Sequence, residues 1–186
     1  CRGVPSGSSL WCGRAVTAAE YLVLNSVGED GRIERTPLMA RYLTRVATPL
    51  AADDAFAYIA DLTNFAEWDP GVRRSVQVAG DGSRMGAAYD VTVAAFPRDL
   101  TLRYEVVEHD PPHTCLVVAR SSAFTSTDRI TVEPDGGGSI VTYDAELTLN
   151  GPLGLFDPAL RLAFGRIGDR AAAGLRGALD GTAVDR

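Results

Sequence analysis

Residues 157–179 read DPALRLAFGRIGDRAAAGLRGAL, and this stretch decides the fold. Asp157 is a typical helix N-cap and Pro158 suits the first helical position, so the sequence predicts one long helix. Apolar residues recur along it at spacings of three and four and form one stripe: Leu160, Phe164, Ile167, Ala171, Leu175 and Ala178. A long helix that follows a run of strands needs a broad apolar partner, and the face of a sheet is the natural candidate.

Glycines interrupt this helix at positions 165, 168, 174 and 177. Each costs about 1 kcal/mol of helix propensity relative to alanine. A helix that tolerates them draws its stability from packing, and small residues let another surface approach closely.

The residues before this helix predict a run of strands with two short helices after the first strand. The expected strands span 40–48, 72–79, 85–96, 100–108, 114–121, 124–133 and 140–149, and the expected short helices span 51–60 and 61–68. Short turns join consecutive strands from residue 72 onward, which implies an antiparallel meander. The predicted class is therefore α+β, with a seven-stranded curved antiparallel sheet.

Alternation along the strands shows that one face of this sheet is apolar. In residues 100–108 one face carries Leu100, Leu102, Tyr104 and Val106, and the other carries Thr101, Arg103 and Glu105. Residues 140–149 alternate in the same way, with Asp144 and Glu146 on the polar face. Such a sheet curls around the long C-terminal helix, the two short helices close its open end, and the wrap leaves a cavity between sheet and helix.

Composition divides the chain into one folded domain and two flanking segments. Residues 39–180 form the expected domain, and residues 181–186 a tail. Residues 1–38 are predicted to be a poorly ordered N-terminal extension or sequence outside the true start. A lipid-bearing Cys1 is the less favoured alternative, since the segment that would prove it is absent.

Charge and cysteine content disfavour several classes of protein. The net charge is −6 and all eighteen basic residues are arginine, so neither nucleic acid nor an anionic membrane is the expected partner. No apolar run reaches the roughly 18 residues of a membrane span. The cysteines, Cys1, Cys12 and Cys115, form no disulfide framework or zinc pattern. We therefore expect a cytoplasmic protein without metal or cofactor, as a monomer or homodimer.

Several short motifs resemble the START-like (SRPBCC) superfamily, in its polyketide cyclase/dehydrase and lipid-transport branch. They are Pro49, the run Phe56-x-x-Ile59-x-Asp61, the run Phe65-x-x-Trp68-x-Pro70-Gly71, the turn Gly137-Gly138-Ser139, and Gly151-Pro152-Leu153. The resemblance covers residues 39–179 and implies a helix-grip fold with a deep hydrophobic pocket. No catalytic motif runs through the branch, so catalytic residues stay unknown.

Tyrosines on the apolar faces are the first candidates to line such a pocket. Tyr89, Tyr104 and Tyr143 can each orient a carbonyl or hydroxyl of a ligand, or pack in the core. Trp68 ends the second short helix and serves either as an entrance wall or as a packing anchor. Phe164, on the stripe of the long helix, completes the expected apolar lining.

A carboxylate and a guanidinium are the more informative candidates. In FTSTDRITV, residues 124–132, Asp128 shares one face with Ser126 and Ile130, so an inward face brings a carboxylate into the cavity with a raised pKa. Arg74 shares the parity of Val72, and an Arg74–Asp128 pair would be a buried ion pair or a polar anchor for a ligand. The alternative is that a bulge or twist turns both side chains to solvent.

Three functions remain open at this point. The leading one is binding of a hydrophobic small molecule, such as a lipid, a polyketide-like aromatic or an isoprenoid, in the internal cavity. The second is an enzyme, a polyketide cyclase, aromatase or dehydratase, in which the tyrosines with Asp128 or Arg74 move protons or polarise carbonyls. The third is a protein-interaction or regulatory module with a vestigial pocket. The first predicts a dry cavity and saturable binding of an apolar probe, and it fails if side chains fill that cavity.

Overall fold

The computed structural model describes residues 39–95, 97–150 and 158–184, without the side chains of Met39 and residues 158–164. The predictions for residues 1–38, for the Asp157 cap and for the Phe164 side chain lie outside this description. The elements are β1 (Met39–Thr48), α1 (Ala52–Ala60), the 3₁₀ helix η1 (Leu62–Asn64), α2 (Phe65–Trp68), β2 (Val72–Ala79), β3 (Ala88–Val93), β4 (Leu100–Asp110), β5 (Thr114–Arg120), β6 (Phe124–Asp135), β7 (Gly138–Leu149), α3 (Pro158–Ala178) and β8 (Thr182–Ala183).

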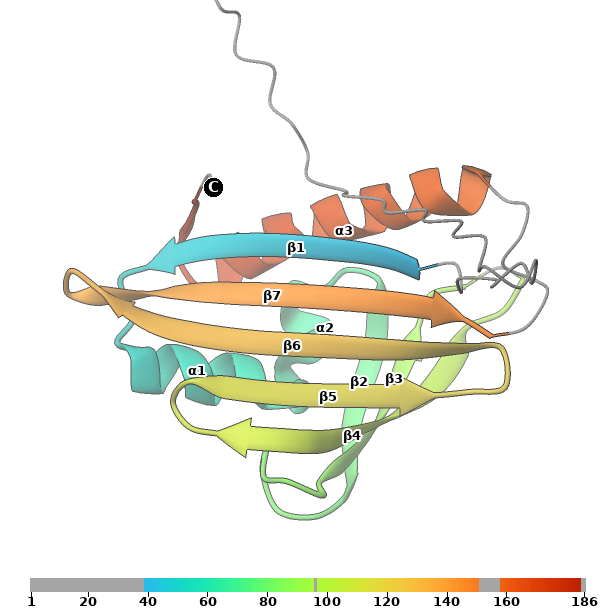
Figure 1. The fold of residues 1–186 in the computed structure, drawn as a ribbon, viewed down its shortest axis with the longest axis horizontal. Helices are drawn as coiled ribbons and strands as arrows, with labels where there is room; N and C mark the ends of the chain where they lie inside the picture. Colours follow the sequence, from blue (N-terminus) through green and yellow to red (C-terminus); the bar gives the residue numbers. More distant parts are fainter. Residues whose placement is uncertain (1–38, 96, 151–157, 185–186) are drawn as a thin grey trace, which may run out of the picture.

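The strands form one antiparallel sheet in the order β2-β3-β4-β5-β6-β7-β1-β8 (Figure 1). The predicted meander is confirmed from β2 to β7, and β1 returns to pair with β7 from Met39↔Thr148 to Thr48↔Ser139. The eighth strand, β8, is not among the predicted ones; it is two residues long and pairs with Val46 and Ala47 of β1. The strand predicted over residues 85–96 is shorter, because residues 85–87 lie in the connection before β3, which ends at Val93.

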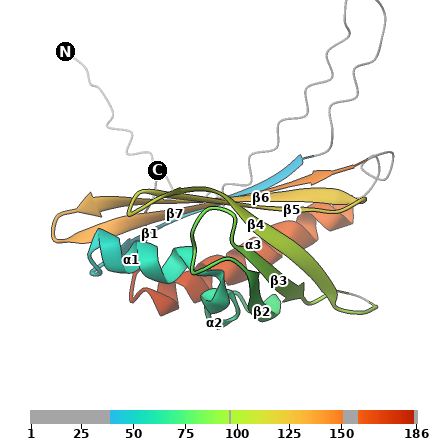
Figure 2. The same ribbon diagram turned by 90° about the horizontal axis from the view of Figure 1, so that it is seen from below.

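All three α-helices lie on one side of the curved sheet (Figure 2). At one end β2 and β3 bend away from the plane of the other strands, towards the helices. The curved sheet and the C-terminal helix confirm the predicted α+β, helix-grip arrangement. Alternation explains which face is covered: in β4, Leu102, Tyr104 and Val106 are buried, whereas Arg103 on the other face pairs with Asp90 of β3.

The predicted apolar stripe of α3 is only partly correct. Ala171 and Leu175 are buried as expected, but Ile167 is 50% exposed and Ala178 is exposed. Other residues of α3 and the turn after it take their place in the interior: Gly168, Ala172 and Leu179. The helix is turned this way because small residues allow close packing, and a Cβ at Gly168 would lie 2.2 Å from the ring of Tyr42.

The core lies between the helices and the concave face of the sheet. It joins Phe56 and Ile59 of α1 to Val132 and Val141 of the sheet and to Leu175 of α3. Within the described ranges, no helix has the length and apolarity that crossing a membrane requires.

Candidate functional site

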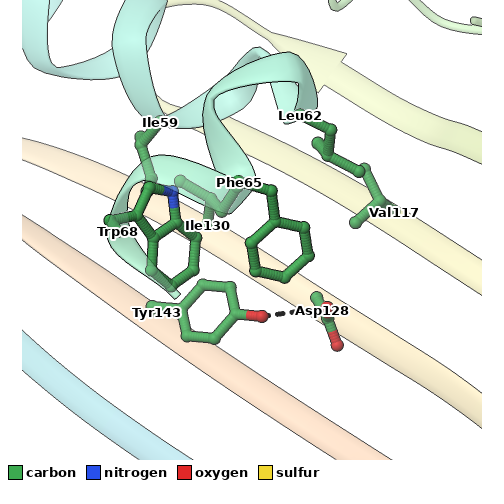
Figure 3. A pocket seen from close by; sticks show the side chains of 8 residues that line it. All are labelled: Ile59, Leu62, Phe65, Trp68, Val117, Asp128, Ile130 and Tyr143. Carbon is green, nitrogen blue, oxygen red and sulfur yellow. Dashed lines mark hydrogen bonds between the residues drawn. The ribbon is translucent and has the colours of Figure 1, made fainter. Parts of the chain in front are cut away.

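A small cavity lies between the short helices and the middle strands of the sheet (Figure 3). Eight side chains line it: Ile59, Leu62, Phe65, Trp68, Val117, Asp128, Ile130 and Tyr143. Its volume is about 10 Å³, which is close to the minimum that holds one water molecule. This described cavity is therefore far smaller than the deep pocket that the resemblance implies, and the side chains of residues 158–164 of α3 lie outside the description.

Asp128 is a charged side chain in this apolar wall. The ladders from β5 through β6 to β7 run without a register shift and place Val117, Asp128 and Ala145 side by side. Of the two orientations that the sequence leaves open, the even-numbered residues of β6 therefore take the inward one, and Asp128 is only 3% exposed. In Figure 3 its carboxylate lies beside the hydroxyl of Tyr143, below the ring of Phe65.

Three hydroxyl groups, those of Tyr104, Ser126 and Tyr143, lie around this carboxylate. We call these three residues together with Asp128 the Asp128 cluster. The Tyr143 hydroxyl donates to Asp128 Oδ2 at 2.9 Å, and the Ser126 hydroxyl donates to Asp128 Oδ1 at 3.2 Å. The Tyr104 hydroxyl donates in turn to Ser126 Oγ at 3.1 Å. The cluster crosses from β4 to β7, so the fold brings together groups from three strands.

Burial sets the ionisation of this cluster. It raises the pKa of Asp128 from 3.8 to about 6, although the hydrogen bonds from Tyr143 and Ser126 act in the opposite direction. Burial also raises the pKa of Tyr143, and the Asp128 charge adds to the effect. The same two causes raise the pKa of Tyr104. Near neutral pH both phenols therefore stay protonated while the carboxylate is close to its titration.

Trp68 packs over the cavity from α2. Its ring stacks on Phe65 with centroids 4.7 Å apart and meets Tyr143 edge-on at 5.3 Å. Helix α3 passes so close behind it that a Cβ at Gly174 would lie 1.8 Å from the Trp68 carbonyl oxygen. The backbone of α2 is therefore held between the sheet and α3.

Residues 39–180 match the family described as Polyketide cyclase / dehydrase and lipid transport. The chain belongs to this family. No curated protein matches the sequence. The family and its fold point to hydrophobic small molecules as the general class of ligand.

Solved structures similar to this member of the polyketide cyclase / dehydrase and lipid transport family share its fold at low sequence identity. A START superfamily protein from Mycobacterium smegmatis matches with a TM-score of 0.59 and 16% identity over 76% of this chain and 97% of that one. The di-domain ARO/CYC BexL from the BE-7585A biosynthetic pathway matches with 0.57 and 14%, over 76% and 50% of the two chains. Ara h 8.0201 matches with 0.54 and 13%, over 76% and 97%.

Four of the predicted site residues lie close together in the structure: Trp68, Tyr104, Asp128 and Tyr143. Tyr89 is fully buried, but its hydroxyl donates to the Gly82 carbonyl at 2.8 Å and lies outside the cavity lining. Burial raises the pKa of Tyr89 to about 12. The ligand-binding role of these residues stays a prediction.

The inward orientation predicted for Arg74 is wrong. The ladder between β2 and β3 shifts register between Val72 and Arg74, so the parity that holds for Val72 does not carry over. Arg74 is exposed on the other face of the strand, and it forms no pair with Asp128. In the described part of the chain, hydroxyl groups and not a guanidinium therefore hold the carboxylate in the cavity.

Sequence reasoning missed a second carboxylate near the site. Asp69, directly after α2, has a pKa raised by burial, and its charge further raises the pKa of Asp128. Its side chain accepts a hydrogen bond from the Gly71 amide at 2.7 Å, which explains its place at the end of α2. Within the described part of the chain, no group of three or more His, Cys, Asp or Glu side chains has the arrangement of a metal site.

Proposed function

We propose that this protein binds an apolar small molecule that carries one polar group. The apolar body occupies the space between the concave face of the sheet and α2, and the Asp128 cluster contacts the polar group. One observation carries the proposal: a buried carboxylate, with no basic partner among the described residues, faces a wall of aliphatic and aromatic side chains. Such a group is costly in a purely structural core, and perturbed carboxyls of this kind gather at functional sites.

Binding requires the aromatic side chains over the cavity to move. The present volume of about 10 Å³ admits no organic ligand. Phe65 and Trp68 come from the four-residue helix α2, and their rings cover the cavity. A ligand that takes their place recovers the apolar contact that they lose, so the exchange costs less than opening an empty cavity.

Trp68 provides the test of this proposal. The sequence contains two tryptophans, so a Trp11→Phe variant leaves Trp68 as the sole tryptophan. In this background we expect a saturable change in fluorescence when octanol is titrated. The change should weaken in Asp128→Asn and persist in Asp144→Asn, which removes a carboxylate from the outer face of β7, where it pairs with Arg41. A linear, unsaturable response to octanol would refute the proposal and favour an interaction module with a vestigial pocket.

A second candidate function is catalysis of the cyclase or dehydratase type. It is favoured by the pKa of Asp128, raised to about 6 by burial, because a general base works best when its pKa lies near the working pH. The expected sign is faster deuterium incorporation at the central carbon of a β-diketone, followed by NMR. Asp128→Asn should abolish the acceleration while leaving folding intact. An unchanged rate in that variant would exclude Asp128 from the chemistry.

A further inference from the structure

The direction of the hydrogen bonds in the Asp128 cluster limits what the cluster can bind. A hydroxyl group has one proton to donate. Tyr143 and Ser126 give theirs to the two carboxylate oxygens, and Tyr104 gives its proton to Ser126. All three protons are thus used inside the cluster. What the cluster still offers to a ligand is lone pairs, on the carboxylate and on the phenol oxygens.

The charges around the cavity have the same consequence. Among the described residues that line it, the only charged one is Asp128, and none is basic. Among the described residues, a second carboxylate, Asp69, acts on Asp128 from outside the lining. The indole N–H of Trp68 is a donor in the lining, but in Figure 3 its nitrogen lies on the side of the ring away from Asp128. The polar end of the site is therefore rich in acceptors and negative in charge.

We propose that the polar group of the ligand is a hydrogen-bond donor, namely an alcohol, a phenol or a protonated amine, and that carboxylates and phosphates are rejected. This inference rests on the proposed function and narrows its ligand class. An alcohol or amine donates to a carboxylate lone pair and leaves the three internal hydrogen bonds intact. An anion brings a second negative charge beside a buried carboxylate and finds no free proton there.

An ether is disfavoured for a related reason. Its oxygen only accepts hydrogen bonds, so beside the ionised cluster it meets lone pairs on every side. It gains a partner only if Asp128 is protonated or if a hydroxyl abandons the carboxylate. Both changes break an arrangement that the free protein already satisfies.

The inference is tested with four ligands that share one octyl chain: octanol, octylamine, octyl methyl ether and octanoate. Binding is followed by the Trp68 fluorescence of the Trp11→Phe protein near pH 8, where a carboxyl with a pKa of about 6 is ionised. If hydrophobic transfer alone decided the affinity, the ether would bind more tightly than the alcohol. We expect the reverse, with octanol and octylammonium bound about tenfold more tightly than the ether, as a hydrogen bond to a charged group provides. Octanoate should bind most weakly.

Two carboxylate variants locate the source of this preference. Asp128→Asn should reduce the advantage of octanol over the ether to about threefold or less and restore octanoate binding. Asp144→Asn, which removes a carboxylate from the opposite face of the neighbouring strand, should keep the wild-type order. The wild-type order is decisive by itself, so the test stands even if Asp128→Asn fails to fold.

The outcomes separate this inference from the function on which it rests. If octanoate or the ether binds as tightly as octanol, the donor preference is overturned while ligand binding stands. If none of the four ligands gives a saturable signal, the proposed function itself fails, and the inference fails with it.

Discussion

The substitution Asp128→Asn should change the stability of the protein in a pH-dependent way. Relative to the wild type, the variant should be more favoured at neutral pH than at acidic pH. Burial raises the pKa of this carboxyl from 3.8 to about 6. Between these two values the folded protein keeps the proton while the unfolded chain has lost it, so the free energy of unfolding of the wild type falls as the pH rises. Above about pH 6 both states are ionised and the cost is complete.

The expected size follows from the shift. Two pKa units correspond to about 3 kcal/mol, at about 1.4 kcal/mol per unit. Asparagine has almost the same shape and carries no charge, so the variant lacks this titration. The unfolding free energy of the variant minus that of the wild type should therefore rise by about 2.4 kcal/mol from pH 4, where the unfolded carboxyl is already partly ionised, to pH 7 and then stay level. Tyr104 and Tyr143 stay protonated in this range, and Asp69 is present in both proteins.

Urea unfolding at a series of pH values, followed by circular dichroism, measures this difference directly. Asp144→Asn is the matched control, because it removes a carboxylate of the outer face that pairs with Arg41. A difference that stays level from pH 4 to pH 7, or that falls, would refute the reasoning. It would mean that water or another partner stabilises the Asp128 charge in the folded protein.

Further substitutions test the packing and hydrogen bonds around the site. Tyr143→Phe removes a hydrogen bond to the buried carboxylate and should cost about 1.5–3 kcal/mol near pH 8 and less at pH 4, by urea unfolding; equal losses at both pH values would contradict this. Ser75 Oγ is buried without a partner, so Ser75→Ala should leave the melting temperature unchanged or raise it, and a clear loss would argue for a hidden partner. Gly174→Ala places a Cβ against the Trp68 carbonyl and should lower the melting temperature. Gly177→Ala is the control, because a Cβ there meets nothing within 4 Å. Its melting temperature should rise, in line with a helix-propensity gain of up to about 1 kcal/mol. A higher melting temperature for Gly174→Ala than for Gly177→Ala would disprove the close contact.

The fold was predictable because periodicity and short turns decide it. Alternation placed Asp128 on the inner face correctly, since the ladders on both sides of β6 run without a register shift. The same reasoning failed for Arg74, because the register shift after Val72 has no mark in the sequence. Parity therefore predicts the face of a side chain only within an uninterrupted ladder.

The orientation of α3 could not be predicted from hydrophobicity. Hydrophobicity predicts that Ile167 is buried and makes no such prediction for Gly168. Yet Gly168 faces the interior, because the ring of Tyr42 occupies the space that a side chain would need. The partner of Asp128 was equally hidden, since Tyr143 reaches it only through the exact register of the β6–β7 hairpin. Close contacts of this kind depend on distances of a few ångströms, which residue types alone do not define.

The place of β1 between β7 and β8 has a consequence for folding during synthesis on the ribosome. Arg41 and Asp144, whose side chains pair diagonally across the β1–β7 ladder, are 103 positions apart in the chain. At a synthesis rate of about 5–20 residues per second, β1 leaves the ribosome on the order of 5–20 s before its partner. During that interval both of its edges are open to foreign strands. Among the described strands, β1 therefore stays without its ladder partner for longest during synthesis, and the β1–β7 pairing is the one for which a chaperone has the longest time to act.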